Sequence, residues 1–167
     1  MPRLFVALEP SPEFRDALAA LQDRLRAAGV AGRWPDPACL HMTLAYIGMW
    51  PEDVTTLLPP IRRPFPLTLS QLGIFPGADV LWAGVEPSAE LDCLAAEVRR
   101  ILDGAGIPFD RQPFFPHITL ARKPRLPEGF SLPEFAVPAA VLTVREVCLY
   151  QSEPGMRYTV IGRGMTL

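Results

Sequence analysis

The chain carries one short pattern twice, and the two copies hold its only two histidines. The first copy is His41-Met42-Thr43-Leu44-Ala45-Tyr46, and the second is His117-Ile118-Thr119-Leu120-Ala121-Arg122. In a β-strand successive side chains point to opposite faces. Each copy therefore predicts a strand with an imidazole and a hydroxyl on one face and apolar side chains on the other. We expect the apolar face to pack on helices and the polar face to line a groove.

Two such strands facing one groove bring together His41, His117, Thr43 and Thr119. Imidazole titrates near neutrality, so one ring can accept a proton while the other donates one. Two hydroxyls can donate hydrogen bonds to the non-bridging oxygens of a phosphate. This set suits in-line attack of water on a phosphodiester, and it requires no metal when the leaving group is already strained, as in a cyclic phosphate.

A longer internal repeat contains the two histidine motifs. Residues 81–91 match residues 4–14 at an offset of 77, and the match continues through the following helix to Gly29 and Gly106. The histidines lie 76 residues apart, so one deletion keeps the halves aligned. Each half is predicted to form a strand, a capped helix, a loop and a motif strand. Two similar halves can face each other across a pseudo-twofold axis, with a cleft between them for a small ligand.

The rest of the chain is predicted from periodicity and from turn residues. A strand is expected at 3–8, a helix from Ser11-Pro12 to Gly29, a short strand at Arg33-Trp34, the first motif strand at 39–47, a short helix at 52–58 and a strand at 66–74. The tail is predicted to form one long strand at 139–152, a turn at 153–155 and a returning strand at 156–163. We expect this hairpin to extend the sheet of one lobe.

Composition limits the class of partner. The formal net charge is −2 and the pI is near 5.7, which argues against a broad nucleic-acid-coating surface but allows recognition of one nucleotide or one RNA end. Three scattered cysteines argue against a disulfide framework. The chain begins directly with a predicted strand, and no window reaches the ~18 apolar residues of a membrane span. We expect a cytoplasmic monomer without membrane contact.

At the histidine motifs and around them, the chain resembles the two-histidine phosphoesterase superfamily. More closely, it resembles the RNA 2′,3′-cyclic phosphodiesterases, also called 2′-5′ RNA ligases. The resemblance covers essentially the whole chain, and the segments that carry it are residues 3–8, Arg33-Trp34, 40–48, 80–85, 114–122, 150–152 and Tyr158.

The resemblance implies an α+β fold with two antiparallel-sheet lobes, outer helices and a central groove. We expect one bilobal domain over residues 1–167, with the repeats at roughly 3–48 and 80–123. The resemblance also implies hydrolysis of a 2′,3′-cyclic phosphate, on RNA ends or nucleotides, to a 2′-phosphate. This reaction would need neither metal nor cofactor. Weak, reversible 2′-5′ RNA ligation would be the same chemistry with an RNA hydroxyl as nucleophile. By analogy with relatives, His117 is the base and His41 the acid, while Thr43 and Thr119 hold the phosphate oxygens.

Arg122 and Tyr46 end the two motifs and are candidate substrate contacts. The family often has arginine at the position of Arg122, where a guanidinium would offset phosphate charge or stack on a base. Simple alternation puts Arg122 on the face opposite His117, so a bulge is needed to turn it inward. The alternative is a solvated arginine at a strand end. Tyr46 can stack on a nucleobase or pack in the core. Many relatives carry a basic residue where this chain has Phe115, which puts the substrate length in question.

The same residues are compatible with other functions. The groove can belong to a non-catalytic nucleotide-binding module, or to a phosphodiesterase that acts on 2′-5′-linked oligonucleotides or another cyclic phosphate. Cys39 shares a predicted strand face with His41, and His117 could join them around a metal. Stable zinc sites need three or four ligands at defined spacing, so we expect Cys39 to be buried filler and no metal site.

Overall fold

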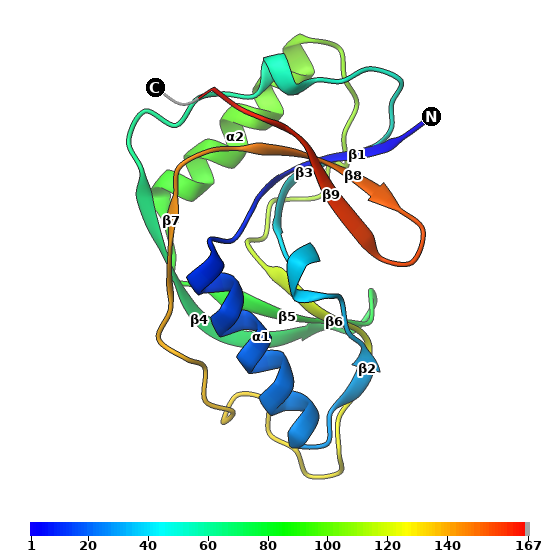
Figure 1. Ribbon diagram of the computed structural model, residues 1–167, viewed down its shortest axis with the longest axis vertical. Helices are drawn as coiled ribbons and strands as arrows, with labels where there is room; N and C mark the ends of the chain where they lie inside the picture. The colour runs from blue at the N-terminus through cyan, green and yellow to red at the C-terminus, as the bar shows by residue number, and fades with distance from the viewer. Residues whose placement is uncertain (166–167) are drawn as a thin grey trace.

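The computed structural model describes residues 1–165, which form two antiparallel sheets with one α-helix beside each (Figure 1). The first sheet has the order β3-β1-β8-β9, and its strands are Met42–Met49, Arg3–Leu8, Cys148–Glu153 and Arg157–Arg163. The second sheet has the order β2-β6-β5-β4-β7, and its strands are Ala31–Arg33, Ile118–Arg125, Val80–Val85, Phe65–Phe75 and Val141–Val144. The expected α+β architecture of two antiparallel lobes is confirmed.

The two helices begin and end where the sequence predicts. Helix α1 spans Pro12–Ala27, and α2 spans Ala89–Gly104. Ser11 Oγ caps α1, and Ser88 Oγ caps α2 by accepting a backbone N–H three residues later. Just beyond the last turn of α1, Gly29 has a φ of 99°, a conformation that side chains disfavour. Within residues 1–165, neither helix has both the length and the apolar character needed to cross a membrane.

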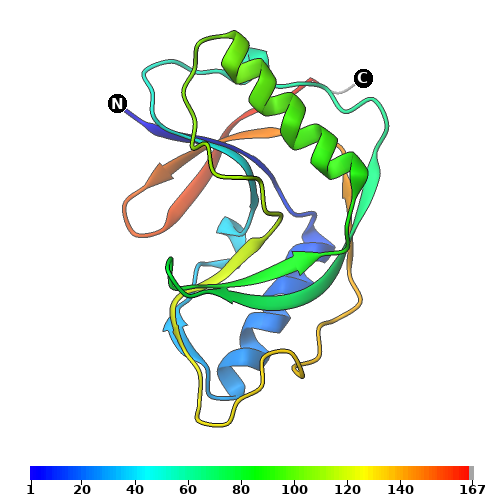
Figure 2. The same ribbon diagram turned by 180° about the vertical axis from the view of Figure 1, so that it is seen from behind.

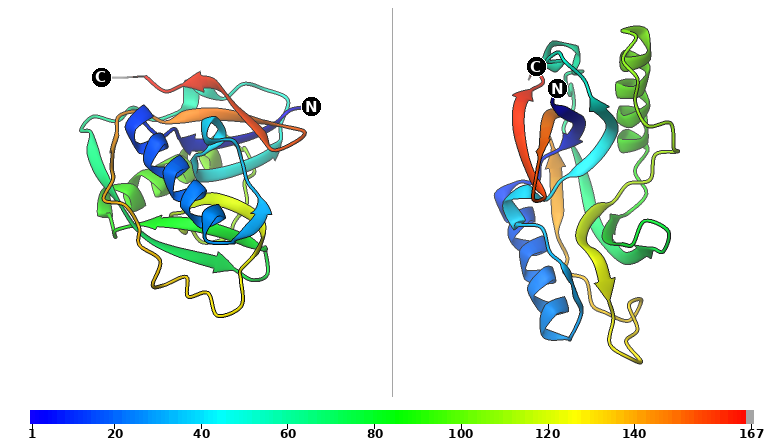
Figure 3. Two further views of the ribbon diagram at one scale, coloured as in Figure 1. Left: turned by 60° about the horizontal axis from the view of Figure 1, so that its bottom comes forward. Right: turned by 90° about the vertical axis from the view of Figure 1, so that its right-hand side faces the viewer.

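Each helix lies against the sheet of the other repeat. Helix α1 follows β1 of the first sheet but runs along the second sheet, while α2 follows β5 of the second sheet and runs along the first (Figures 1 and 2). The two helices consequently lie on opposite sides of the molecule (Figure 3). Side-chain hydrogen bonds link α1 to β6 through Gln22 and α2 to β3 through Arg99. The two halves therefore interlock.

One continuous apolar core connects the sheets and the helices. Helix α1 buries one face, and α2 buries the equivalent face; these residues are Phe14, Leu18, Leu21 and Leu25, then Leu91, Leu94, Val98 and Leu102. They pack against inward-facing strand residues such as Leu44 and Leu120, both fully buried. Burying one such side chain contributes about 1.5–3 kcal/mol. The core thus fixes the faces of β3 and β6 that point away from the groove.

Three short elements differ from the sequence prediction. The motif strand β3 begins at Met42 and not at residue 39, because Pro37–Cys39 forms a 3₁₀ turn capped by Asp36. The helix expected at 52–58 is reduced to a 3₁₀ turn at Thr55–Leu57. Strand β2 stops at Arg33, so Trp34 lies outside it. In the first two cases, an aspartate side chain accepts a backbone N–H two residues on and favours a tight turn.

The predicted long strand at 139–152 is wrong, because the segment divides between the sheets. Strand β7 pairs with β4 in the second sheet, whereas β8 pairs with β1 and β9 in the first. Arg145 and Glu146 interrupt the apolar run, and the chain crosses from one lobe to the other there. The β8–β9 hairpin that extends one lobe's sheet is confirmed, with Gly155 in its turn at a φ of 82°.

Candidate active site

The two histidines immediately precede β3 and β6, and the same local hydrogen bond holds each ring. Nδ1 of His41 lies 2.8 Å from the carbonyl oxygen of Cys39, and Nδ1 of His117 lies 2.8 Å from that of Phe115. A carbonyl can only accept, so Nδ1 carries the proton in each neutral ring. Both rings therefore keep the Nε2 lone pair free for chemistry.

The alternation that the motifs predict is present in both strands. Met42 and Leu44 are buried while Thr43 is partly exposed, and the same order recurs in β6 at Ile118, Thr119 and Leu120. Apolar packing behind each strand therefore leaves the histidine and the threonine on the open face.

Each motif strand then contains an extra residue at the same position. Leu44 in β3 and Leu120 in β6 are skipped in the pairing with β1 and β5. The flanking pairs are Val6 with Ala45 and Ala7 with Thr43 in the first sheet, and Leu81 with Ala121 and Trp82 with Thr119 in the second. One extra residue in a strand is a β-bulge, and it reverses the alternation beyond it.

The bulges decide where Tyr46 and Arg122 point. Beyond each bulge the alanine, Ala45 or Ala121, is buried and the residue after it is exposed. Tyr46 is 40% exposed, and Arg122 is exposed as well. Both side chains lie on the histidine face, and both line a cavity that also contains His41. The bulge required to turn Arg122 inward is therefore present.

Two cavities that share Thr43 and Tyr46 lie along the groove between the sheets. The smaller, about 300 Å³, is lined by Phe5, His41, Thr43, Tyr46, Arg122, Ser152 and Tyr158. The larger, about 690 Å³, contains His117, and its lining includes Phe75, Arg99, Asp110, Gln112 and Phe115. Residues from both sheets thus meet in one groove. Thr119 is partly exposed but borders neither cavity.

Aromatic rings surround His41. The ring centroids of Phe5, Tyr150 and Tyr158 lie 4.7, 5.2 and 5.0 Å from that of the imidazole. Burial among them lowers the pKa of His41 to about 4, although the hydrogen bond to Cys39 opposes the shift. The positive charge of Arg122 and the nearby imidazole of His117 lower this pKa further.

His117 has a more open environment. Its ring lies 5.0 Å from Phe75 and 6.2 Å from Phe115, measured between centroids. Burial lowers its pKa, the hydrogen bond to the Phe115 carbonyl opposes the shift, and the charge of Arg122 lowers it further. Arg122 thus acts on both histidines, and both lowered pKa values favour uncharged rings at neutral pH.

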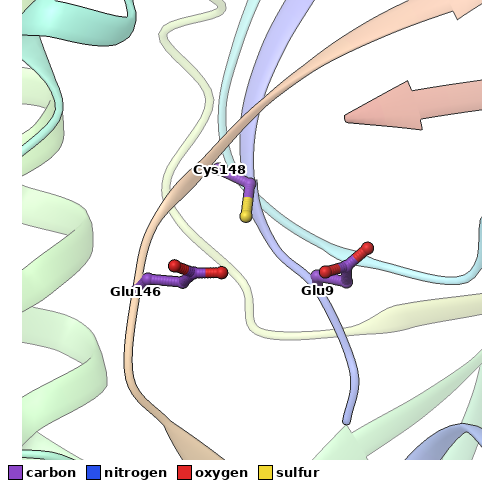
Figure 4. A group of neighbouring side chains, drawn as sticks. All are labelled: Glu9, Glu146 and Cys148. Carbon is purple, nitrogen blue, oxygen red and sulfur yellow. The ribbon is translucent and has the colours of Figure 1, made fainter. Parts of the chain in front are cut away.

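Within residues 1–165, the potential metal ligands that gather within 4.8 Å of one another are Glu9, Glu146 and Cys148 (Figure 4). Arg163 Nη1 donates to both carboxylates, at 2.8 and 2.7 Å. Burial raises the pKa of the Cys148 thiol to about 12, so this sulfur stays protonated. The Arg163 guanidinium thus already pairs with both carboxylates of the cluster. These contacts join the end of β1, β9 and the β7–β8 crossing. Cys39 contributes its carbonyl, not its thiol, to His41.

Comparison with known proteins identifies the family of this chain. The model of the 2′-5′ RNA ligase superfamily matches residues 10–155. The chain belongs to the 2′-5′ RNA ligase superfamily. The chain is also similar to several proteins named RNA 2′,3′-cyclic phosphodiesterase. One from Geobacillus stearothermophilus is 29% identical over 89% of this chain and 51% of its own length, and one from Aeropyrum pernix is 39% identical over 63% and 65%. The chain therefore spans about half to two thirds of these relatives. It spans 92% of a Thermus thermophilus relative of the same name, at 34% identity.

Solved structures match the chain over essentially its full length. A crystal structure of E. coli LigT complexed with 3′-AMP has a TM-score of 0.77 and 29% identity, and covers 100% of this chain and 99% of that one. A crystal structure described only as a phosphoesterase has a TM-score of 0.78 and 27% identity, with 99% and 98% coverage. The lobed fold is therefore shared over its full length.

Sequence reasoning did not identify several residues of the groove, among them Phe75 and Arg99. Phe75 packs edge-on against His117, and Arg99 lines the larger cavity from α2. No signal marks Phe75, which lies one residue beyond the strand predicted at 66–74 and is the last residue of β4. Arg99 does carry a signal, because it lies 77 positions after Gln22 and so occupies the equivalent place in the repeat.

Proposed function

We propose that the protein hydrolyses a 2′,3′-cyclic phosphate, at an RNA end or on a nucleotide, to a 2′-phosphate. The observation that carries this proposal is the pair of imidazoles, both with a free Nε2, in one groove with Arg122. The names of the relatives support the same substrate class. Since both repeats line the groove, we propose the whole bilobal domain as the catalytic unit.

In this mechanism the cyclic phosphate lies where the two cavities meet beside Thr43, between His41 of the smaller cavity and His117 of the larger one. Thr43 and Thr119 donate to non-bridging oxygens, and the Arg122 guanidinium stabilises the charge that develops there. One imidazole removes a proton from water as the water oxygen bonds to phosphorus. The P–O3′ bond breaks on the opposite side, and the second imidazole protonates O3′. The phosphate remains on O2′, and no cofactor or metal takes part.

The division of the two proton transfers has two candidates. The resemblance assigns His117 as base and His41 as acid, which requires the bound phosphate to raise the pKa of His41 from about 4. The protein's own electrostatics favour the reverse, because burial lowers the pKa of His41 more than that of His117 and so leaves His117 easier to protonate. A substrate whose leaving group needs no proton distinguishes the two assignments.

The larger cavity suits the nucleoside. Tyr46 and Phe115 present rings that are 40% and 47% exposed, and a base can stack on either. Asp110 and Gln112 offer polar groups to its edge. An RNA 5′-hydroxyl entering in place of water would attack the same phosphorus, so we propose weak 2′-5′ ligation as a side activity.

The deciding experiment is product analysis with a short RNA that ends in a 2′,3′-cyclic phosphate. Phosphorus NMR is expected to show a 2′-phosphate, and EDTA is expected to leave the rate unchanged. His41→Ala and His117→Ala should each reduce the rate by about 10²–10⁴-fold and leave the circular dichroism spectrum intact. Binding without turnover would indicate a nucleotide-binding module. Faster cleavage of 2′-5′-linked oligonucleotides would indicate the other phosphodiesterase activity.

A further inference from the structure

Gln22 and Arg99 make equivalent pairs of hydrogen bonds in the two halves of the molecule. Gln22 Nε2 donates to the carbonyl oxygens of Leu120, at 3.0 Å, and Pro35, at 3.2 Å. Arg99 donates from Nε to the carbonyl of Leu44, at 3.1 Å, and from Nη1 to that of Gln112, at 2.8 Å. All four acceptors are backbone oxygens, so the interaction depends on the donor and not on the acceptor's side chain.

The donors and the acceptors correspond across the internal repeat. Gln22 and Arg99 lie 77 positions apart, as do Pro35 and Gln112, and Leu44 and Leu120 lie 76 apart, like the two histidines. Because the helices are exchanged between lobes, each donor reaches the motif strand of the other repeat. Two different side chains, an amide and a guanidinium, thus perform one task twice. A single fortuitous contact would not recur with both of its partners.

The shared target of these donors is the extra residue of each bulge. Leu120 and Leu44 lie outside the regular ladder, so their carbonyl groups need a partner from elsewhere. Gln22 is 3% exposed and is the one polar side chain that is buried among residues 1–165. A buried amide that gives both of its N–H groups to backbone oxygens has little freedom to move.

We infer that Gln22 and Arg99 are positioning residues, which hold the bulges of β6 and β3 and thereby aim Arg122 and Tyr46 into the groove. Without the donor, the bulge can shift along the strand, and a shift of one residue turns the following side chains to the other face. Arg122 would then leave the smaller cavity, which it lines together with His41. Only the kcat/KM measurements depend on the proposed function. The orientation of Arg122 can also be followed without turnover, through its effect on the pKa values of the two histidines.

The test is a double-mutant cycle. Gln22→Met removes both donors at nearly constant volume, and it is expected to lower kcat/KM about tenfold when Arg122 is present and less than twofold in an Arg122→Ala background. A purely structural role would give the same loss in both backgrounds, which would overturn the inference. Arg100→Met, at an exposed arginine of α2, is the control and should have no effect.

The second repeat provides an independent arm if Gln22→Met does not fold. Arg99→Met should lower kcat/KM by a similar factor, and this loss should disappear in a Tyr46→Ala background. Arg99→Gln installs the side chain that performs the task at position 22, and it should retain activity within about threefold. Equal losses for Arg99→Gln and Arg99→Met would mean that the charge of Arg99 acts directly, and would contradict the inference.

An NMR titration separates this inference from the proposed function. Arg122 lowers the pKa of both histidines, so Gln22→Met should raise both pKa values towards those of Arg122→Ala. This readout needs no turnover. If the wild-type protein fails to hydrolyse the cyclic phosphate but Gln22→Met still shifts the two histidines, the function is wrong and the positioning role stands. Unchanged histidine pKa values in Gln22→Met would overturn the positioning role.

Discussion

Tyr46 and Arg122 occupy equivalent positions, five residues after His41 and His117, and both face the groove between the sheets. Regular strands would turn them away from the histidines. The bulges at Leu44 and Leu120 bring them back to the histidine face. One device, used twice, thus places an aromatic ring at one wall of the groove and a cation at the other.

Arg122 is expected to influence both substrate binding and the two histidines. Arg122→Gln should lower kcat/KM about 10²-fold, since a guanidinium that stabilises transition-state charge contributes on that scale. The same change should raise the pKa of His41 and His117, because the positive charge that opposes their protonation is lost. Histidine NMR titration measures the second effect. Arg125→Gln, at the exposed end of β6, is the matched control, and equal effects in the two variants would contradict the role of Arg122.

The identity of the general acid can be found from the leaving group. A cyclic substrate with sulfur in place of O3′ has a leaving group that needs no proton. The variant that lacks the acid should therefore recover most of its activity on this substrate, while the variant that lacks the base should not. Rates of His41→Ala and His117→Ala on the oxygen and sulfur substrates give the comparison. Recovery of His117→Ala would support the electrostatic assignment, recovery of His41→Ala would support the assignment by resemblance, and recovery of neither would contradict acid catalysis by these residues.

Burial of His41 predicts a loss of stability in acid. Its pKa is about 4 in the folded protein and about 6.5 in the unfolded chain, so between these values the unfolded chain binds more protons. Stability should therefore fall as the pH decreases from about 6.5 to about 4, and His41 makes no such contribution above that range. From pH 7 to pH 4.5, the wild-type protein should lose about 1–3 kcal/mol more than His41→Gln. Urea unfolding at both pH values measures this, and parallel losses would refute it.

The sequence predicts the repeated units well and their exchange poorly. The helix caps at Ser11 and Ser88 and the two polar motif faces follow from local chemistry, so they were predictable. The exchange of helices between lobes depends on which sheet each apolar helix face meets, and the two sheets offer similar surfaces. Periodicity cannot distinguish them. The division of residues 139–152 is missed for the same reason, because β7 and β8 are both apolar and only their partners differ.

The groove residues show the same division between local and long-range information. His41 and His117 are found because the repeat is visible in one dimension. The aromatic shell that lowers the pKa of His41 comes from β1 and from the β8–β9 hairpin, which lies far from β1 in the sequence. Pairwise register, not composition, places Phe5 opposite Tyr150 beneath the imidazole. An electrostatic property of the site thus depends on sheet order, which the motif alone does not contain.

Gly73 is expected to be required for close packing of the aromatic wall beside His117, which consists of Phe75, Trp82 and Phe115. It pairs with Trp82 across β4 and β5, and a Cβ at this position would overlap the indole ring. Trp82 is buried and packs against Phe75 and Phe115, with ring centroids 5.3 and 5.1 Å away, so it has little room to retreat. Gly73→Ala should therefore lower the free energy of unfolding by about 1–3 kcal/mol, the usual cost of overpacking.

The matched control is Gly77→Ala in the turn after β4, where a Cβ would meet nothing within 4 Å. Its unfolding free energy should stay within about 0.5 kcal/mol of the wild type. Phe75 and Phe115 also contact His117. Displacement of Trp82 in Gly73→Ala should therefore disturb that imidazole and shift its NMR titration. Unfolding by urea and a histidine titration test both parts. If Gly73→Ala is as stable as Gly77→Ala, Trp82 is free to move and the wall beside His117 is not held by packing.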